Sequence, residues 1–305
     1  SSELPLVIVA SYPKSGTTWM QSIVYHLATR GRLPLGHISD HAPFIENDAS
    51  WIHNDDGTSA VAPRFAAGHT VCGVRMFNTH LRWSHMPASP SARFIYLVRS
   101  PRDVVLSFYE HLSHQAPEDG GYTRSLDAFV SEWVSGSIVF GSWAAHLRSW
   151  LQDEAAALGR AGRDERVLVV SFEELRANLR RTCIKVASHL GIGALSEADL
   201  ERALPHLSFA TMKAHAHRYE PRSVRWVRRE GDEEDFCFIR KGEVGGARRV
   251  LGPDHELALQ KMLEREARGA AVGTANGVEY LLEQVKDGAL SPGWSLLQFF
   301  GACRR

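Results

Sequence analysis

The segment "VIVASYPKSGTTWMQSI", from Val7 to Ile23, contains an apolar stretch, a glycine-containing turn and an amphipathic stretch in direct succession. Its first part, Leu6–Tyr12, is rich in β-branched residues and lies between two prolines, which is typical of a buried strand. Thr17–Thr29 repeats apolar residues at helical spacing. A turn between such a strand and helix points several backbone N–H groups and the positive end of the helix dipole at one place. The sequence therefore predicts a cradle for a phosphate or sulfate.

The lysine of this turn stands before the glycine. In the pattern G-x-x-x-x-G-K-[ST], which binds nucleoside triphosphates, the lysine follows the second glycine and the next hydroxyl binds Mg²⁺. Here Lys14 precedes Gly16, two threonines follow, and no acidic partner for a metal is evident. This order favours a nucleotide whose reactive group carries less charge than a γ-phosphate and needs no metal. Taken alone, the turn also fits a serine–threonine helix cap beside an exposed lysine.

Two further strand–helix units follow along the chain. Phe94–Val98 predicts a buried strand, and Pro101 suits the first turn of the helix after it. Val167–Ser171 predicts a third strand, before a helix from about Glu173 that stops at Gly191. Helical spacing also marks two stretches between these units, Ser125–Val134 and Ile138–Leu158. Strands that alternate with helices predict an α/β fold with a mostly parallel central sheet flanked by helices.

The composition limits the classes of function. The 305 residues are 44% hydrophobic and carry 35 basic and 35 acidic side chains, so no global field favours nucleic acid or an anionic membrane. The four cysteines form no C-x-x-C pair, and no N-terminal leader is recognisable. No window approaches about 18 consecutive apolar residues. We expect a cytoplasmic protein without a membrane span or a nucleic-acid partner, folded as one domain over residues 1–305.

The chain resembles the cytosolic-type sulfotransferases. The segments that match motifs of that family occur in the same order: "SYPKSGTTW" (Ser11–Trp19), "YLVRSPRDVVLSFYEH" (Tyr96–His111), "GSWAAHLRSW" (Gly141–Trp150), "VVSFEEL" (Val169–Leu175) and "FIRKGEVG" (Phe238–Gly245). The resemblance implies a P-loop-like three-layer fold and a single sulfotransferase domain. It also implies the donor 3′-phosphoadenosine 5′-phosphosulfate, the product adenosine 3′,5′-bisphosphate and no metal.

The resemblance also assigns the donor site residue by residue. Lys14 and the backbone N–H groups after it would hold the 5′-phosphosulfate, and Lys14 would stabilise the charge on the leaving oxygen. Arg99 and Ser107 would bind the 3′-phosphate. Ser107 would also hold Lys14 away from the bridging oxygen until the acceptor binds. The full predicted donor set is Lys14, Ser15, Gly16, Thr17, Thr18, Trp19, Arg99, Ser107, Phe172, Phe209, Met212, Arg240, Lys241 and Gly242. Without the resemblance, Trp19 equally fits a core aromatic, and "RKG" is a common surface triplet.

His80, in "MFNTHL", is the predicted base. A neutral imidazole near pH 7 can accept the proton of an acceptor hydroxyl as that oxygen attacks sulfur, and the T-H pair matches the catalytic segment of the family. The implied reaction is an in-line displacement onto a hydroxyl, less often an amine, without a covalent enzyme intermediate.

Aromatic residues define the predicted acceptor pocket. Phe44 and Phe140 are expected to line it, which favours a small alcohol or phenol. Basic residues within Arg218–Arg229 also allow an acidic or glycosidic acceptor. The longer segment Arg218–Gly246 is irregular in sequence and is either a lid or an exposed loop.

Several positions depart from the family pattern. Asn78 stands where many members have a lysine, Phe172 where a tyrosine often meets adenine, and Leu207 where a threonine is frequent. After the R-K-G triplet, "GGARR" (Gly245–Arg249) replaces the usual G-D-W. The family's dimer motif is not recognisable, so a homodimer stays open. A P-loop nucleotide kinase and a non-catalytic nucleotide-binding homologue are the alternative functions.

Overall fold

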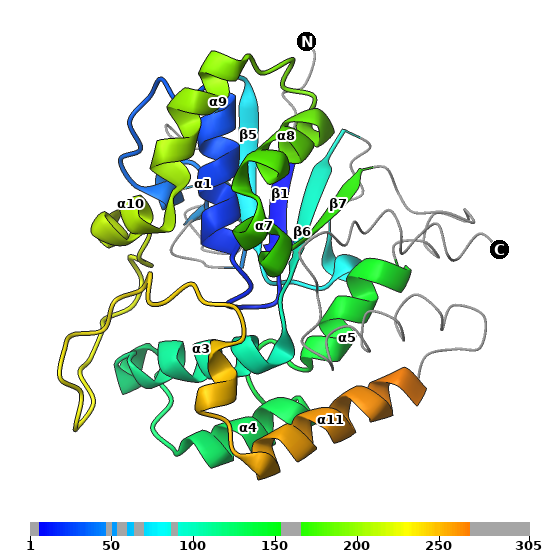
Figure 1. Ribbon diagram of the computed structural model, residues 1–305, viewed down its shortest axis with the longest axis vertical. Coiled ribbons are helices and arrows are strands. Elements are labelled where there is room, and N and C mark those ends of the chain that lie inside the picture. The colour runs from blue at the N-terminus through cyan, green and yellow to red at the C-terminus, as the bar shows by residue number, and fades with distance from the viewer. Residues whose placement is uncertain are drawn as a thin grey trace.

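The computed structural model describes residues 6–46, 51–53, 60–63, 70–86, 91–153 and 166–268. Its central sheet has the strand order β4-β5-β1-β6-β7 (Figure 1). The strands β1 (Leu6–Ser11), β5 (Val74–Thr79), β6 (Arg93–Val98) and β7 (Val167–Ser171) are parallel, and β4 (Thr70–Val71) runs antiparallel to β5. A separate hairpin pairs β2 (Trp51–His53) with β3 (Ala60–Pro63). The three strands predicted from the sequence are confirmed to within one residue at each end, whereas β5 is not among them.

Side chains of the central strands point alternately to two apolar cores, because successive residues of a strand face opposite sides of a sheet. Ile8 and Phe94 belong to one core, and Val9 and Ile95 belong to the other. The first core is covered by α3 (Pro101–Ser113), α4 (Leu126–Ser135), α5 (Trp143–Arg148) and α11 (Pro253–Arg268). The second is covered by α1 (Thr17–Ala28), α8 (Leu179–Leu190) and α9 (Glu197–Ala203). The sheet is therefore the middle of three layers, and Figure 1 shows the two groups of helices.

Two predicted helices differ from the observed ones. The predicted stretch Ile138–Leu158 becomes helical only at Trp143, because Phe140 and Gly141 have φ values of 71° and 68° and Ser142 caps α5. A π-helical turn, Ser149–Asp153, follows α5, and the rest of that stretch lies outside the described residues.

The predicted helix from about Glu173 to Gly191 is divided into two. Its parts are α7 (Phe172–Ala177) and α8, and Asn178 at the break, with φ −151°, accepts a hydrogen bond from the backbone N–H of Arg181 to cap α8. Gly191, with φ 63°, ends α8 as predicted.

Residues 219–245 lie after α10 (Phe209–Ala214) and, within this described part of the chain, contain no helix or strand. We call this segment the strap. Val227 donates its backbone N–H to the carbonyl of His114 (2.8 Å), and Ala116 donates to the carbonyl of Arg225 (2.9 Å). The strap is thus fixed to the end of α3. A search of the described residues finds no helix of the length and apolarity that a bilayer crossing requires.

Candidate functional site

The predicted anion cradle lies at the carboxyl end of β1, where the chain turns into α1. Lys14 and Gly16 both adopt left-handed backbone conformations, with φ 65° and 105°. A Cβ atom on Gly16 would lie 2.9 Å from the ring of Phe172, so this position requires glycine. Gly16 is also the N-cap residue of α1 and has no side-chain oxygen with which to cap it. The backbone N–H groups of the first turn therefore remain available to an anion.

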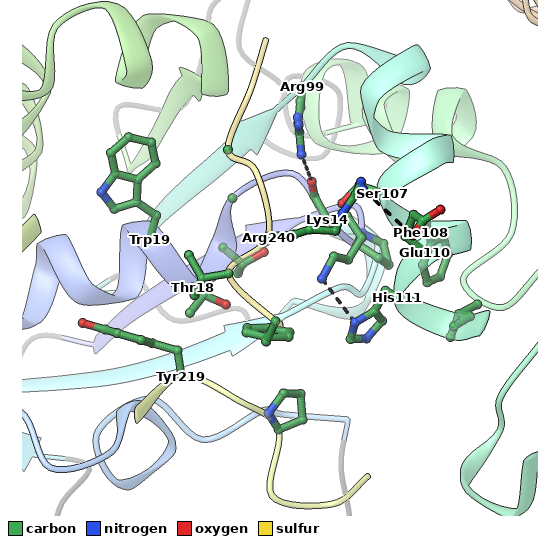
Figure 2. A pocket seen from close by; sticks show the side chains of 18 of the residues that line it. Lys14, Thr18, Trp19, Arg99, Ser107, Phe108, Glu110, His111, Tyr219 and Arg240 are labelled. Carbon is green, nitrogen blue, oxygen red and sulfur yellow. Dashed lines mark hydrogen bonds and ion pairs between the residues drawn. The ribbon is translucent and has the colours of Figure 1, made fainter. Parts of the chain in front are cut away.

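A cavity of about 1050 Å³ opens in front of this turn (Figure 2). Its walls come from the β1–α1 turn, the end of β5, α3, α7, α10 and the strap. Every predicted site residue except Ser15 lines it, namely Lys14, Gly16, Thr17, Thr18, Trp19, Phe44, His80, Arg99, Ser107, Phe140, Phe172, Phe209, Met212, Arg240, Lys241 and Gly242. The side chain of Ser15 is buried, and its Oγ finds no partner among the described residues.

Arg99 joins the turn to the strap. Its Nη1 donates to the carbonyl of Lys14 (3.0 Å), and its Nη2 donates to the carbonyl of Glu243 (3.0 Å). Its guanidinium carbon lies 4.3 Å from the ring centroid of Phe172. The buried Nε has no hydrogen-bond partner within the described chain, so this donor of Arg99 is not committed to the protein.

Lys14 extends from the turn toward α3. Its Nζ lies 3.3 Å from Nδ1 of His111 and 4.5 Å from the ring centroid of Phe238. The hydrogen-bond partner of Nζ within the described structure is therefore His111, rather than Ser107 as the resemblance implies. Burial, followed by the charges of Arg99 and Arg240, lowers the pKa of Lys14 to about 7. An anion in the cavity would raise this pKa again, because it favours the charged form of the lysine.

The altered "GGARR" segment is held by a carboxylate of α3. Asp103 is buried and accepts hydrogen bonds from the backbone N–H groups of Gly245 (2.7 Å) and Ala247 (3.1 Å). Gly242 has φ 60°, and a Cβ atom there would lie 2.4 Å from the ring of Phe209. These two contacts fix the end of the strap next to the cavity despite the departure from the family pattern.

Three arginines of the strap pair with carboxylates of other segments. Arg222 binds Asp40, Arg225 binds Asp119 (2.9 Å) and Arg229 binds Glu110 (3.3 Å). These basic groups therefore meet acidic partners within the protein. The strap is a wall of the cavity, which it lines with Pro221–Val224 and with residues 238–243.

His80 directly follows β5, at the same edge of the sheet as the turn. Its Nδ1 lies 2.7 Å from the carbonyl oxygen of Ser11. Because a carbonyl only accepts, Nδ1 carries the hydrogen and Nε2 holds the lone pair. Burial lowers the pKa of His80 to about 4, so the ring is neutral at pH 7. The ring centroids of Phe44 and Phe140 lie 5.1 Å and 5.4 Å from that of His80.

Two histidines near this site were missed by the sequence reasoning. His146 is fully buried; its Nε2 lies 2.9 Å from the carbonyl of His80, and its Nδ1 lies 3.0 Å from the hydroxyl of Tyr96. It thus supports the backbone that carries His80. His111 contacts Lys14 and comes one helical turn after Ser107. That i, i+4 spacing was a usable signal for His111, whereas nothing in the sequence marks the contact of His146.

Departures from the family pattern have local explanations. The side-chain amide of Asn78 donates to the carbonyl of Ala42 (2.7 Å), so it makes a structural hydrogen bond to the backbone. The indole N–H of Trp19 donates to the carbonyl of Leu207 (2.9 Å), a contact that needs no threonine side chain. Trp19 is 9% exposed and packs edge-on against Phe172, 5.9 Å away, and it also lines the cavity. This position fits both interpretations of Trp19, as a core aromatic residue and as a site residue.

Within the described ranges, no group of three or more His, Cys, Asp or Glu residues is placed to hold an ion.

Comparisons with known proteins agree with this architecture. Residues 4–271 match the family described as Sulfotransferase domain. The amine sulfotransferase of Oryctolagus cuniculus is 26% identical over 272 residues, 86% of this chain and 80% of that protein. Human sulfotransferase 1E1 is 30% identical over 215 residues, 68% of this chain and 66% of that protein.

Solved structures show the same fold. Mouse sulfotransferase SULT7A1 complexed with PAP has a TM-score of 0.61 at 20% identity and covers 94% of this chain and 91% of its own. Retinol dehydratase in complex with retinol and PAP has a TM-score of 0.64 at 19% identity, with coverages of 89% and 84%. The predicted P-loop-like three-layer fold is thereby confirmed.

Proposed function

Because the chain belongs to the sulfotransferase domain family, we propose that it transfers a sulfuryl group from 3′-phosphoadenosine 5′-phosphosulfate to the hydroxyl of a small alcohol or phenol. An amine is the less favoured acceptor. One observation carries the proposal: a single cavity contains the N-terminal turn of α1, the basic side chains of Lys14, Arg99, Arg240 and Lys241, and a histidine whose Nε2 holds a lone pair. The turn and the basic groups suit a nucleotide with anionic groups at both ends, and the histidine suits deprotonation of an acceptor.

The donor fits the groups that line the cavity. Lys14 and the N–H groups of residues 15–18 would hold its 5′-phosphosulfate, where Ser15 Oγ is buried without a partner among the described residues. Arg99, whose Nε lacks a partner in the same part of the chain, would bind the 3′-phosphate together with Ser107, Arg240 and Lys241. Aromatic and sulfur contacts for the adenine would come from Trp19, Phe172, Phe209 and Met212. When bound, the donor supplies the sulfuryl group and the phosphate oxygen that leaves.

His80 would take the proton of the acceptor. Its Nδ1–H is committed to the carbonyl of Ser11, so the proton arrives at Nε2. The low pKa of His80, about 4, keeps the ring neutral before the reaction. Lys14, in its ammonium form, would stabilise negative charge as it appears on the leaving oxygen. Positioning and electrostatics then carry the rate, without a covalent enzyme intermediate.

The acceptor class follows from the surroundings of His80. Phe44 and Phe140 flank its ring, which favours a flat or apolar alcohol or phenol. The arginines of the strap pair with Asp40, Asp119 and Glu110, and this argues against the acidic acceptor considered from the sequence. Among the relatives, the name of a 3-alpha-hydroxysteroid sulfotransferase from Cavia porcellus supports an apolar alcohol here, and the name of the amine sulfotransferase supports the less favoured amine.

Isothermal titration with adenosine 3′,5′-bisphosphate tests the donor site. We expect binding without a metal, and a loss of roughly tenfold or more in Arg99→Ala, since a hydrogen bond to a charged group contributes about 1.5–3 kcal/mol. A parallel titration with ATP and Mg²⁺ is the comparison. Preference for ATP with Mg²⁺ would support the nucleotide kinase instead.

An acceptor screen with sulfur-labelled donor separates catalysis from mere binding. Transfer of label to a phenol or alcohol, lost in His80→Ala, is the expected result. Bisphosphate binding without transfer to any hydroxyl or amine would support the non-catalytic homologue. A cytoplasmic location, a single domain over residues 1–305 and a homodimer stay predictions.

A further inference from the structure

His111 lies on α3 with both ring nitrogens engaged. Its Nδ1 is 3.3 Å from Lys14 Nζ, and its Nε2 is 2.9 Å from the amide nitrogen of Gln115, which follows the C-terminal end of α3. Gln115 is 7% exposed, and both residues line the cavity. The imidazole also packs against the rings of Trp226 and Phe238, with centroids 5.2 Å and 5.7 Å away. The ring is therefore held on several sides.

Lys14 needs such a partner. Its side chain has four rotatable bonds and a large rotamer entropy, and the guanidinium groups of Arg99 and Arg240 repel its charge. In Figure 2 its chain runs toward His111, while Arg99 approaches its backbone from the other side. Of the described side chains, it is His111 that gives Nζ a hydrogen bond.

We propose that His111, oriented by Gln115, is a positioning residue that holds the Lys14 amine in place for the donor. The inference rests on the proposed function, because it concerns the lysine assigned there to the leaving oxygen. His111 acts through Lys14 and is not itself assigned a contact with donor or acceptor.

The pair of His111 and Gln115 suits both protonation states of Lys14. Burial and the neighbouring charges of Lys14, His80 and His114 hold the pKa of His111 well below its usual range, so the ring is neutral and carries one hydrogen. With the Gln115 NH₂ group donating to Nε2, the hydrogen lies on Nδ1 and faces an uncharged amine. After a half turn of the amide, the oxygen of Gln115 accepts from Nε2–H, and the lone pair of Nδ1 faces the ammonium.

Two substitutions of His111 distinguish the roles of its two ring nitrogens. His111→Asn places an amide group near the position of Nδ1 and keeps a partner for Lys14, whereas His111→Gln places its amide near Nε2 and loses that partner. We expect His111→Gln to lower kcat/KM for the donor and the affinity for adenosine 3′,5′-bisphosphate by roughly tenfold or more. His111→Asn should recover both to within about threefold of wild type. His217→Gln, the same change at an exposed histidine outside the cavity, is the matched control.

A double-mutant cycle tests whether His111 acts through Lys14. In a Lys14→Met background, His111→Gln should cause no further loss of bisphosphate affinity, because the group that it positions is gone. Equal losses in His111→Asn and His111→Gln, or an additive loss in the Lys14→Met background, would overturn the inference. If the thermal transition shows that His111→Gln does not fold, Gln115→Leu replaces it in the cycle. A loss of bisphosphate affinity that Gln115→Leu still causes in the Lys14→Met background would also overturn the inference.

The same titrations distinguish a failure of the proposed function from a failure of the role proposed for His111. A wild-type protein that does not bind the bisphosphate contradicts the proposed function. Wild-type binding with no difference between the Asn and Gln variants contradicts only the role of His111.

Discussion

Two residues of the cavity have complementary charge states: His80 is a neutral base, and Lys14 is a cation that titrates near neutrality. Burial penalises the charged form of both His80 and Lys14, and it lowers both pKa values. The consequences are opposite, because the base must be uncharged to accept a proton, whereas the lysine must be charged to attract an anion. The two groups together therefore define the pH range in which the free enzyme is competent.

The pH dependence of kcat/KM follows from these two groups. Activity requires neutral His80, so it should rise as pH increases through about 4. It also requires the Lys14 ammonium, so it should fall as pH increases through about 7. Because kcat/KM reports the free enzyme, measurements with both donor and acceptor well below saturation, from about pH 3 to 9, test both limbs. Lys14→Arg should move the alkaline limb upward, and an alkaline limb that stays in place in that variant would contradict this assignment.

Replacement of His80 tests the base directly. His80→Ala should lower kcat by roughly two to four orders of magnitude, the usual contribution of a general base. Affinity for adenosine 3′,5′-bisphosphate should change little, since His80 has no assigned contact with it. His85→Ala, at an exposed histidine, serves as the control. Near-normal turnover in His80→Ala would remove His80 from the role of base.

At the scale of elements, the strap is held next to α3 and α10 by a few contacts at its C-terminal end. Asp103 binds the backbone on either side of Gly246, and Gly242 lies directly on the ring of Phe209. These contacts place Arg240 and Lys241 on the cavity wall. The donor affinity should therefore be sensitive to the backbone of this segment as well as to its charges.

A methyl group at Gly242 tests this dependence. Gly242→Ala adds a Cβ atom 2.4 Å from Phe209 at φ 60°, and a left-handed conformation costs an alanine roughly 1–2 kcal/mol. We expect a loss of about tenfold in bisphosphate affinity by titration, with little change in the thermal transition of the protein. Gly252→Ala is the control, because no atom lies within 4 Å of its added Cβ. Equal affinities in the two variants would show that the strap does not depend on Gly242.

At the scale of the whole molecule, the cavity joins distant parts of the chain. Its lining extends from Pro13 to Val250, and Arg99 donates hydrogen bonds both to the β1–α1 turn and to the strap. A ligand that contacts both parts stabilises the folded state, because the unfolded chain has no such site.

Thermal unfolding measures this coupling. Adenosine 3′,5′-bisphosphate at about 100 times its Kd should stabilise the protein by about 2.7 kcal/mol. For a chain of 305 residues that corresponds to a rise in Tm of roughly 4 °C. Since Arg99→Ala is expected to weaken binding by tenfold or more, the rise should fall to about half or less in that variant at the same ligand concentration. A full rise in that variant would show that Arg99 contributes little to the site.

Local sequence patterns determined the donor half of this protein. The anion cradle could be predicted from Val7–Ile23, because a strand, a left-handed turn and a helix are dictated by neighbouring residues. Two more strand–helix units followed in the same way, and parallel pairing brought their ends to one edge of the sheet. Strand β5 was missed although His80 directly follows it, and the break at Asn178 depended on a local cap that the helical pattern obscures.

Only the tertiary structure decided which partners meet. His111 and Lys14 are separated by 97 residues, and Arg99 and Glu243 by 144. The tautomer of His80 depends on a carbonyl of β1, and carboxylates from other segments neutralise Arg222, Arg225 and Arg229 of the strap. Such contacts arise from packing of elements far apart in the chain, and burial in the shared cavity then changes the pKa values. Periodicity and motifs report only on neighbours along the sequence, so they name the reactive groups but not the environment that controls them.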